Sequence, residues 1–356
     1  MFKRISIPYI LVIFILSQSF QLMAQGRQYT LYGYGQVDFS ASSRKGSTSG
    51  FDQRRINFIG EFFPAEQMRV LTDIEYEGGT NIDAGNSSYS GAVKISRVWL
   101  EYTVMPELKI RAGKMLTAFG LYNLIHDASA SYFPLEAPIM YSMFSFSPNL
   151  KPQRLYSKYH IGIELLGTFD LDDTGSQLEY SVGIGNGRGA KADGTDINNG
   201  RSFYSRMIYR PSILSGLQIG SSFYYDRNYE GLGGIQNDLE YTYAFDLQYE
   251  NNSFQFQTEG LITNYKTIDN TRQSTGVWYA QLVYNMFDVL SPYINYSAIL
   301  FDIKNSEHGF SRTNLGINWS VSPYLYLKSE IQFHDAEEVL GDESFNVYKI
   351  SAAFAF

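Results

Sequence analysis

The sequence predicts an all-β protein, a transmembrane antiparallel β-barrel of sixteen strands in a single domain. Three observations lead to this prediction: an aromatic terminal strand, extended segments that recur along the chain, and an unusual composition. Aromatic residues make up 16% of the 356 residues and charged residues only 18%. The 29 tyrosines suit the edge of a membrane, because the ring of tyrosine is apolar and its hydroxyl is wet.

The closing strand, 345–356, has two different faces, because strand side chains alternate with period two. The chain ends on Phe356 without a polar tail, as a lipid-facing strand in an aromatic belt can. This end resembles the signal by which outer-membrane barrels are recognised, so the barrel-assembly machinery is an expected partner through Phe356. An ordinary edge strand is the alternative. One face carries Tyr348, Ile350, Ala352, Phe354 and Phe356, and the other carries Val347, Lys349, Ser351, Ala353 and Ala355.

Residues 1–24 read as a secretory signal, with Lys3 and Arg4 before an apolar run and Ala24 at the cleavage point. The run is too short to span a bilayer as a helix, and no later run reaches about 18 apolar residues. The mature chain, 25–356, is therefore expected in the outer membrane. Removal of residues 1–24 moves the formal net charge from −8 to about −10, and this negative charge argues against a nucleic-acid partner. The absence of cysteine excludes disulfide chemistry and lipidation of an N-terminal cysteine.

Period-two segments that end in turn residues follow one another through the mature chain. They predict strands over 28–39, 54–63, 68–78, 92–104, 108–120, 157–170, 176–187, 202–211, 213–227, 239–251, 253–266, 274–286, 290–303, 310–322, 323–335 and 345–356.

The connections between these segments alternate in length, as in transmembrane barrels with tight periplasmic turns and long outer loops. The short ones are 64–67, 105–107, 171–175, 251–252 and 287–289. The longer ones include 40–53, 79–91, 188–201, 228–238 and 267–273.

The alternation also assigns lipid-facing and inward-facing sides. A Lys or Arg on the lipid face at the midplane costs roughly 2–4 kcal/mol, so the polar side must face the lumen. An interior this polar, within sixteen strands, predicts an aqueous channel. The residues expected to face lipid are Tyr241, Tyr243, Phe245, Leu247, Tyr249, Leu315, Ile317, Trp319 and Val321. Those expected to face inward are Asp246, Gln248, Glu250, Arg312, Asn314 and Asn318.

The longest connection, 121–156, is the third outer one, and it carries the acidic residues Asp127 and Glu136. Loops of this length are usually functional or disordered, and this one is too aromatic for a disordered linker. We expect it to fold inward and narrow the pore. The alternative is a hydrophobic lid on the barrel or against a neighbouring subunit.

A basic set lies on the predicted inner face of four neighbouring strands: Arg55, Arg69, Arg97, Lys109 and Arg111. Charged groups that line a narrow pore set its selectivity. Because Glu61, Asp73, Glu75 and Glu101 share these faces, a wall of compensating ion pairs is the alternative, and the two interpretations are compatible.

No catalytic, cofactor or metal site is predicted. His126 and His334 precede aspartates without any serine in a motif context. The run GIGNGRG, 183–189, ends a strand without a helix behind it, which argues against a phosphate-binding loop. Asp170, Asp172 and Asp173 are better explained as a solvated turn than as calcium ligands.

Residues 108–121, LKIRAGKMLTAFGL, resemble the fifth-strand signature of the phosphate-selective porin O and P family, as does RVWLEY, 97–102, for the paired strand. The matching residues are Arg111, Gly113, Phe119, Gly120 and Leu121. The resemblance implies a trimeric, water-filled outer-membrane channel with Arg111 in the lumen. The family often has a lysine and two prolines where this chain has Leu116, Thr117 and Ala118, so phosphate selectivity is not inferred.

These observations predict a non-enzymatic outer-membrane porin for small hydrophilic solutes, with a weak preference for anions. The anion hypothesis rests on the basic set, which outnumbers the acidic residues Asp127 and Glu136 of the long connection. A non-conducting barrel for adhesion or assembly is the first alternative, and conductance distinguishes it. An enzyme built on a barrel is the second, and an activity assay distinguishes that.

Overall fold

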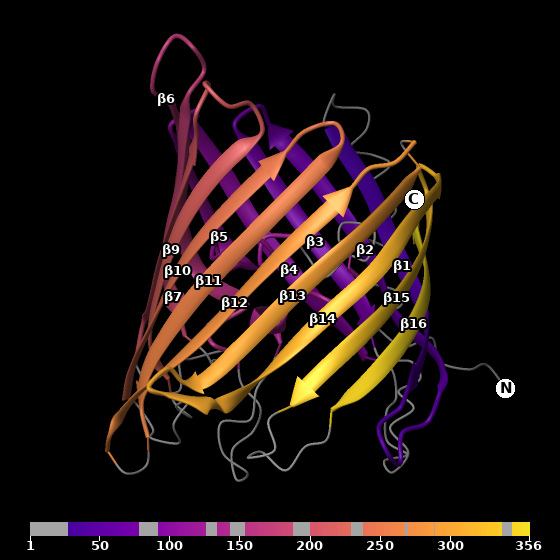
Figure 1. The fold of residues 1–356 in the computed structure, drawn as a ribbon. Coiled ribbons are helices and arrows are strands. Elements are labelled where there is room, and N and C mark those ends of the chain that lie inside the picture. Colours follow the sequence, from indigo (N-terminus) through magenta and orange to yellow (C-terminus); the bar gives the residue numbers. More distant parts are fainter. Residues whose placement is uncertain are drawn as a thin grey trace, which may run out of the picture.

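The computed structural model describes residues 28–77, 92–125, 134–142, 154–187, 200–228, 238–267, 270–287, 289–336 and 344–356. The predicted signal, 1–24, lies outside these residues. The described strands form one closed antiparallel barrel, in which each strand pairs with the next and β1 pairs with β16 (Figure 1). The predicted sixteen-stranded barrel is therefore confirmed.

The strands, in chain order, are β1 (Gln28–Ser42), β2 (Gly50–Ala65), β3 (Met68–Glu77), β4 (Ala92–Met105), β5 (Leu108–Leu116), β6 (Tyr159–Asp170), β7 (Gln177–Asn186), β8 (Ser202–Arg210), β9 (Leu217–Asn228), β10 (Asp238–Glu250), β11 (Phe254–Lys266), β12 (Arg272–Tyr284), β13 (Leu290–Asp302), β14 (Asn305–Ser322), β15 (Leu325–Ala336) and β16 (Phe345–Ala355). A short 3₁₀ helix, η2 (Ile139–Tyr141), lies between β5 and β6. The described residues include no helix that is long and apolar enough to cross a membrane.

Several strand boundaries differ from the predicted ones, and three of the differences have a clear structural reason. The strand predicted over 108–120 ends at Leu116, because the chain turns into the barrel and buries its next residues. The strand predicted over 213–227 begins at Leu217, after a turn that ends in Gly216 with φ +84°. The strand predicted over 310–322 begins at Asn305, because a tight turn joins it to β13.

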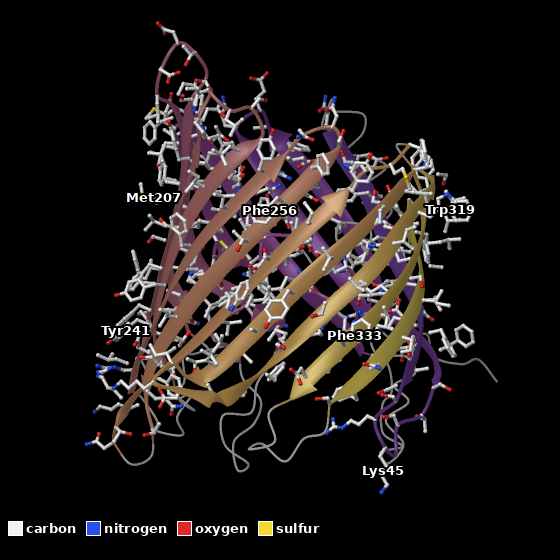
Figure 2. All side chains as sticks on the ribbon, viewed as in Figure 1. Lys45, Met207, Tyr241, Phe256, Trp319 and Phe333 are labelled. Atoms are coloured by element: carbon white, nitrogen blue, oxygen red, sulfur yellow. The ribbon has the colours of Figure 1, made fainter. Side chains whose placement is uncertain are left out.

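The two ends of the barrel differ. The turns after β2, β4, β6, β8, β10, β12 and β14 are short, and they lie with the C-terminus at the upper end in Figure 1. Lys45 marks the tip of the connection between β1 and β2, at the opposite end (Figure 2). We refer to these as the short-turn end and the long-connection end.

The predicted faces of β10 and β14 are confirmed. Tyr243, Phe245 and Trp319 are exposed on the outside, whereas Asp246 and Asn314 are completely buried on the inside. Met207, Tyr241 and Trp319 point away from the barrel wall in Figure 2. The outer wall is thus apolar, as a lipid-facing surface must be.

The barrel closes where β16 meets β1. The backbone N–H of Gly33 donates to the carbonyl of Phe356 at 2.9 Å, and the N–H of Phe356 donates to the carbonyl of Gly33 at 3.0 Å. A side chain at Gly33 would collide with the ring of Phe356, and one at Gly35 with the ring of Phe354. Glycine therefore makes room on β1 for the aromatic rings that end the chain.

Candidate functional site

The connection between β5 and β6 folds into the barrel. Its described parts, 117–125, 134–142 and 154–158, form hydrogen bonds with inward-facing side chains of distant strands. The N–H of Gly120 donates to the hydroxyl of Ser222 at 3.0 Å, and the hydroxyl of Tyr122 donates to Gln281 Oε1 at 2.8 Å. The N–H of Leu135 donates to Glu330 Oε2 at 3.1 Å. These partners lie on β9, β12 and β15, so the described parts of the connection reach across the lumen.

An apolar cluster holds this connection against the wall. Phe119, Met140 and Leu155 are buried almost completely, and each such side chain contributes roughly 1.5–3 kcal/mol relative to an exposed one. The inner faces were predicted to be polar, and over β8–β13 this is only partly right. Because alternation does not distinguish a lipid-facing apolar residue from one covered by a loop, the sequence did not reveal this patch. Its wall residues are Tyr204, Tyr224, Ala244, Leu261, Val277, Tyr279 and Ile299.

Gly120 is required where the connection turns inward. Its φ of +65° is in the left-handed region, and a side chain there would collide with Glu259 Oε1 and lie 2.6 Å from the hydroxyl of Tyr141. The hydroxyl of Tyr141 donates to Glu259 Oε2 at 2.5 Å, so Glu259 has little freedom to move away. The structure therefore requires glycine at the centre of the Phe-Gly-Leu run, at position 120.

We expect Gly120→Ala to displace the connection, at a cost of about 1–3 kcal/mol for overpacking. The measurement is thermal stability in detergent together with protease cleavage within 117–158, and both should show a looser connection. Gly46→Ala is the matched control, because Gly46 also has positive φ, +83°, but has open space around its Cβ position. Equal behaviour of the two variants would contradict this role of Gly120.

The acidic residue Glu136 contacts basic side chains of β14 and β16 rather than the predicted basic set. Arg312 Nη1 of β14 lies 3.0 Å from Glu136 Oε2, and Lys349 of β16 donates to Oε1 of the same carboxylate. Arg54 Nη1 donates to the neighbouring carbonyl of Leu135 at 3.1 Å. Glu136 was expected to face the arginines of β2–β5, and that geometry is not what the structure has. Asp127, the other predicted acid, lies outside the described residues.

Burial raises the pKa of Glu136, but the charges of Lys349 and Arg312 outweigh this effect and hold that pKa well below its usual range. A carboxyl with a lowered pKa stabilises the folded state above its unfolded pKa, and this contribution is lost as the pH falls through the folded pKa. The Glu136 ion pairs are therefore present at neutral pH and throughout mildly acidic conditions.

Each arginine of the predicted basic set has a carboxylate partner on a neighbouring strand. Arg111 lies between two carboxylates, 2.6 Å from Glu101 and 2.7 Å from Glu164, and its guanidinium stacks over Trp99 with 4.4 Å to the ring centroid. Lys109 is half-buried beside these groups, in register with Thr103 and Leu166. The other pairs are Arg55 with Glu75 at 3.8 Å, Arg69 with Glu61 at 2.6 Å and Arg97 with Asp73 at 2.9 Å.

In most of these pairs the cation is the more exposed partner. The side chain of Arg69 is 36% exposed against 13% for Glu61, and that of Arg97 is 16% exposed against 0% for Asp73. Lys94 is 45% exposed, against 3% for its partner Glu75. The arrangement is reversed at β14, where Glu136 is 28% exposed and Arg312 only 5%.

The other candidates from the sequence have structural roles. Gly183 and Gly185 of the glycine run leave room for Tyr204 and His160. The carboxylate of Asp172 accepts hydrogen bonds from Thr174 and Ser176 within a turn. His126 and the side chain of His308 lie outside the described residues. Within the described ranges, no group of three or more His, Asp or Glu side chains could hold a metal ion.

Sequence reasoning did not identify Arg312 and Lys349 as partners of the connection, or the pair of Arg206 and Asp246 at 2.7 Å. The alternation places all of them on inner faces. No local feature of the sequence indicates which charged residues meet inside a barrel, because these contacts depend on strand register and on the path of the connection.

No family model matches the chain, and no curated protein sequence matches it. Its fold is similar to solved structures of outer-membrane proteins. The outer-membrane expressed OmpT of Vibrio cholerae is 10% identical with a TM-score of 0.62, and the match covers 93% of this chain and 98% of that one. The anion-selective porin from Comamonas acidovorans is 12% identical with a TM-score of 0.66, covering 93% and 100%. The outer membrane channel DcaP of Acinetobacter baumannii is 11% identical with a TM-score of 0.57, covering 93% and 97%.

At these identities the similarity concerns the fold, which is that of outer-membrane porins. Membership of the phosphate-selective porin O and P family is not confirmed. In the closed barrel every strand pairs with a neighbour on both sides, so no strand edge has free backbone groups. The outer wall of the barrel is apolar. The chain therefore belongs in the bacterial outer membrane.

Proposed function

We propose that this protein is a porin without enzymatic activity. It forms a water-filled channel through which small hydrophilic solutes diffuse passively, with a weak preference for anions. The observation that carries the anion preference is the unequal exposure within the ion pairs of β1–β6. The arginines and lysine reach toward the lumen, and their carboxylate partners lie behind them.

The position of the charges matters more than their sum. Charges on solvent-exposed loops are screened within about 8 Å at physiological salt, so the formal net charge of −8 does not decide what an ion in the lumen experiences. An ion at the wall of β3–β5 meets guanidinium groups before carboxylates, whereas the exposed carboxylate of the connection, Glu136, is bound to Arg312 and Lys349. The exposed cations therefore dominate the field along this wall, and the inward-folded connection narrows the pore beside it.

The solved structures are consistent with this proposal. One protein of the same fold is described as an anion-selective porin. Another is described in a trimer form, and we propose a homotrimer for this chain as well. The Arg111 position, matched by the resemblance to the phosphate-selective porins, lies on the wall that carries the exposed cations. We propose the barrel-assembly machinery as a partner during insertion, through Phe356.

The test is conductance in a planar lipid bilayer, with the reversal potential measured in a potassium chloride gradient. We expect open channels and a reversal potential on the anion side, since the exposed cations lower the energy of chloride at the wall. Absence of conductance from correctly folded protein would contradict the channel and favour the non-conducting barrel. A cation-side potential would contradict the anion preference alone.

A further inference from the structure

The wall opposite the ion pairs carries a ladder of uncharged amide side chains. Each of the seven neighbouring strands β9–β15 contributes at least one inward-facing amide, and one amide from each strand is in direct cross-strand register with the next. The rungs, in strand order, are Gln218, Gln248, Gln257, Gln281, Asn295, Asn314 and Gln332.

The ladder climbs along the lumen, because residues in register lie on a line across strands that are tilted to the barrel axis. Gln218 follows the first residue of β9, at the short-turn end. Gln332 lies in the half of β15 nearer to the long-connection end. The amides therefore extend from one mouth of the barrel toward the other.

The five rungs from Gln257 to Gln332 are buried, and the inward-folded connection contacts one of them, whereas the two rungs at the short-turn end are open. Gln257, Gln281, Asn295, Asn314 and Gln332 are buried, with the hydroxyl of Tyr122 on Gln281. Gln218 and Gln248 are half-buried and line an open cavity of ≈ 620 Å³ at the short-turn end. Gln177, Arg210 and Glu250 complete its polar lining, together with Thr174, Ser212 and Ser215 of the adjoining turns.

Three amides of the ladder are linked by hydrogen bonds that all point toward the short-turn end. The Asn295 amide donates to Gln281 Oε1 at 3.4 Å, and the Gln281 amide donates to Gln257 Oε1 at 3.3 Å, toward the cavity. Such a chain polarises its members, which strengthens the next hydrogen bond along it. Farther from the cavity, Asn314 is completely buried, and its two amide atoms have no hydrogen-bond partner among the described residues. The ladder thus retains unused donor and acceptor capacity.

The two charged groups of the cavity already have hydrogen-bond partners. Arg210 Nη1 donates to Glu179 Oε2 at 2.7 Å, and Glu250 accepts a hydrogen bond from Gln248 at 3.4 Å. The pairing with Glu179 leaves Arg210 little charge to offer an anion, and amides and hydroxyls make up the rest of the polar lining. An amide presents a donor and an acceptor side by side, as does a hydroxyl group. These features favour an uncharged solute with many hydroxyl groups.

We propose that the cavity at the short-turn end of the amide ladder is a binding subsite for a mono- or disaccharide that passes through the channel. This inference rests on the proposed channel function. It gives the pore two different walls: the ion pairs of β2–β6 for small ions, and the amides of β9–β15 for neutral, hydroxyl-rich solutes.

The experiment is titration of the ion current with maltose, added on the side of the short turns. We expect a saturable decrease of the current in the native protein. In the double variant Gln218→Leu and Gln248→Leu, the half-saturation concentration should rise by about tenfold, because two hydrogen-bonding groups are lost. Gln53→Leu is the control for the change from amide to leucine, because Gln53 lies opposite the exposed Val37 on the outer face of β2, away from the cavity, and this variant should titrate like the native protein.

The outcomes separate the two proposals. Conductance without any effect of maltose would overturn the saccharide subsite and leave the channel standing. Absence of conductance would overturn the channel itself. A stronger block by the zwitterion glycylglycine than by maltose would show that the cavity selects charged termini and would overturn the proposed solute class. Equal titration of the double variant and the native protein would place saccharide binding elsewhere and overturn this assignment.

Discussion

Replacing Arg97 and Arg111 together by alanine is expected to move the reversal potential toward cation selectivity. The change leaves Asp73, Glu101 and Glu164 on the wall without these partners. A unit charge about 8 Å from an ion contributes about 0.5 kcal/mol in bulk water, so two charges change the local concentration of one ion by about fivefold. The permeability ratio changes by at least this factor, because the anion and the cation respond in opposite directions. The measurement is the reversal potential in a salt gradient, compared with that of the native channel.

Two control variants accompany this experiment. Lys45→Ala with Lys304→Ala removes the same charge from exposed positions at the long-connection end, and it should leave the permeability ratio nearly unchanged. Removing one partner of a buried ion pair costs about 3–5 kcal/mol, so folding must be checked. The double variant Arg97→Lys and Arg111→Lys keeps the charge and should keep the selectivity. An unchanged ratio in the folded alanine variant would place these arginines away from the narrow part of the pore.

Deleting Phe356 is expected to reduce the amount of folded protein in the outer membrane by about tenfold or more. The deletion removes both backbone hydrogen bonds to Gly33 that close the barrel, each worth about 0.5–1.5 kcal/mol. It also removes a ring that packs 5.6 Å from Phe58 and covers Gly33. The heat-modifiable band in outer-membrane fractions measures this loss. Channels that do insert should conduct as the native channel does, because Phe356 lies on the outer face.

Phe254→Ala is the matched control for the deletion. Phe254 is also an exposed aromatic residue near the short-turn end, and it packs against Tyr284 within the wall rather than where the barrel closes. Gly33→Val tests the same closure from the other strand, since a side chain there collides with the Phe356 ring. Normal insertion of both altered chains would show that the end of β16 is not needed for assembly.

The period of two determined most of the fold from sequence alone. Side-chain alternation is a local property of an extended chain, so it identified the sixteen strands and the faces of residues such as Tyr243 and Asn314. The same reasoning placed Arg97 and Arg111 beside acidic residues on adjacent strands, because neighbouring strands of a meander pair in sequence order. The prediction failed at residues 117–120, where the sequence continues the alternating pattern of a strand but the chain leaves the sheet and packs inside the barrel.

Only the tertiary structure decided what meets across the lumen. Glu136 contacts Arg312 and Lys349, which lie far from it in sequence, because the connection crosses the barrel. The amide ladder likewise requires seven strands to be in one register, and a shift of one residue would turn a rung to the lipid face. Alternation states which face a side chain occupies; the depth at which it lies and the group opposite it follow from register and from the closure of the barrel.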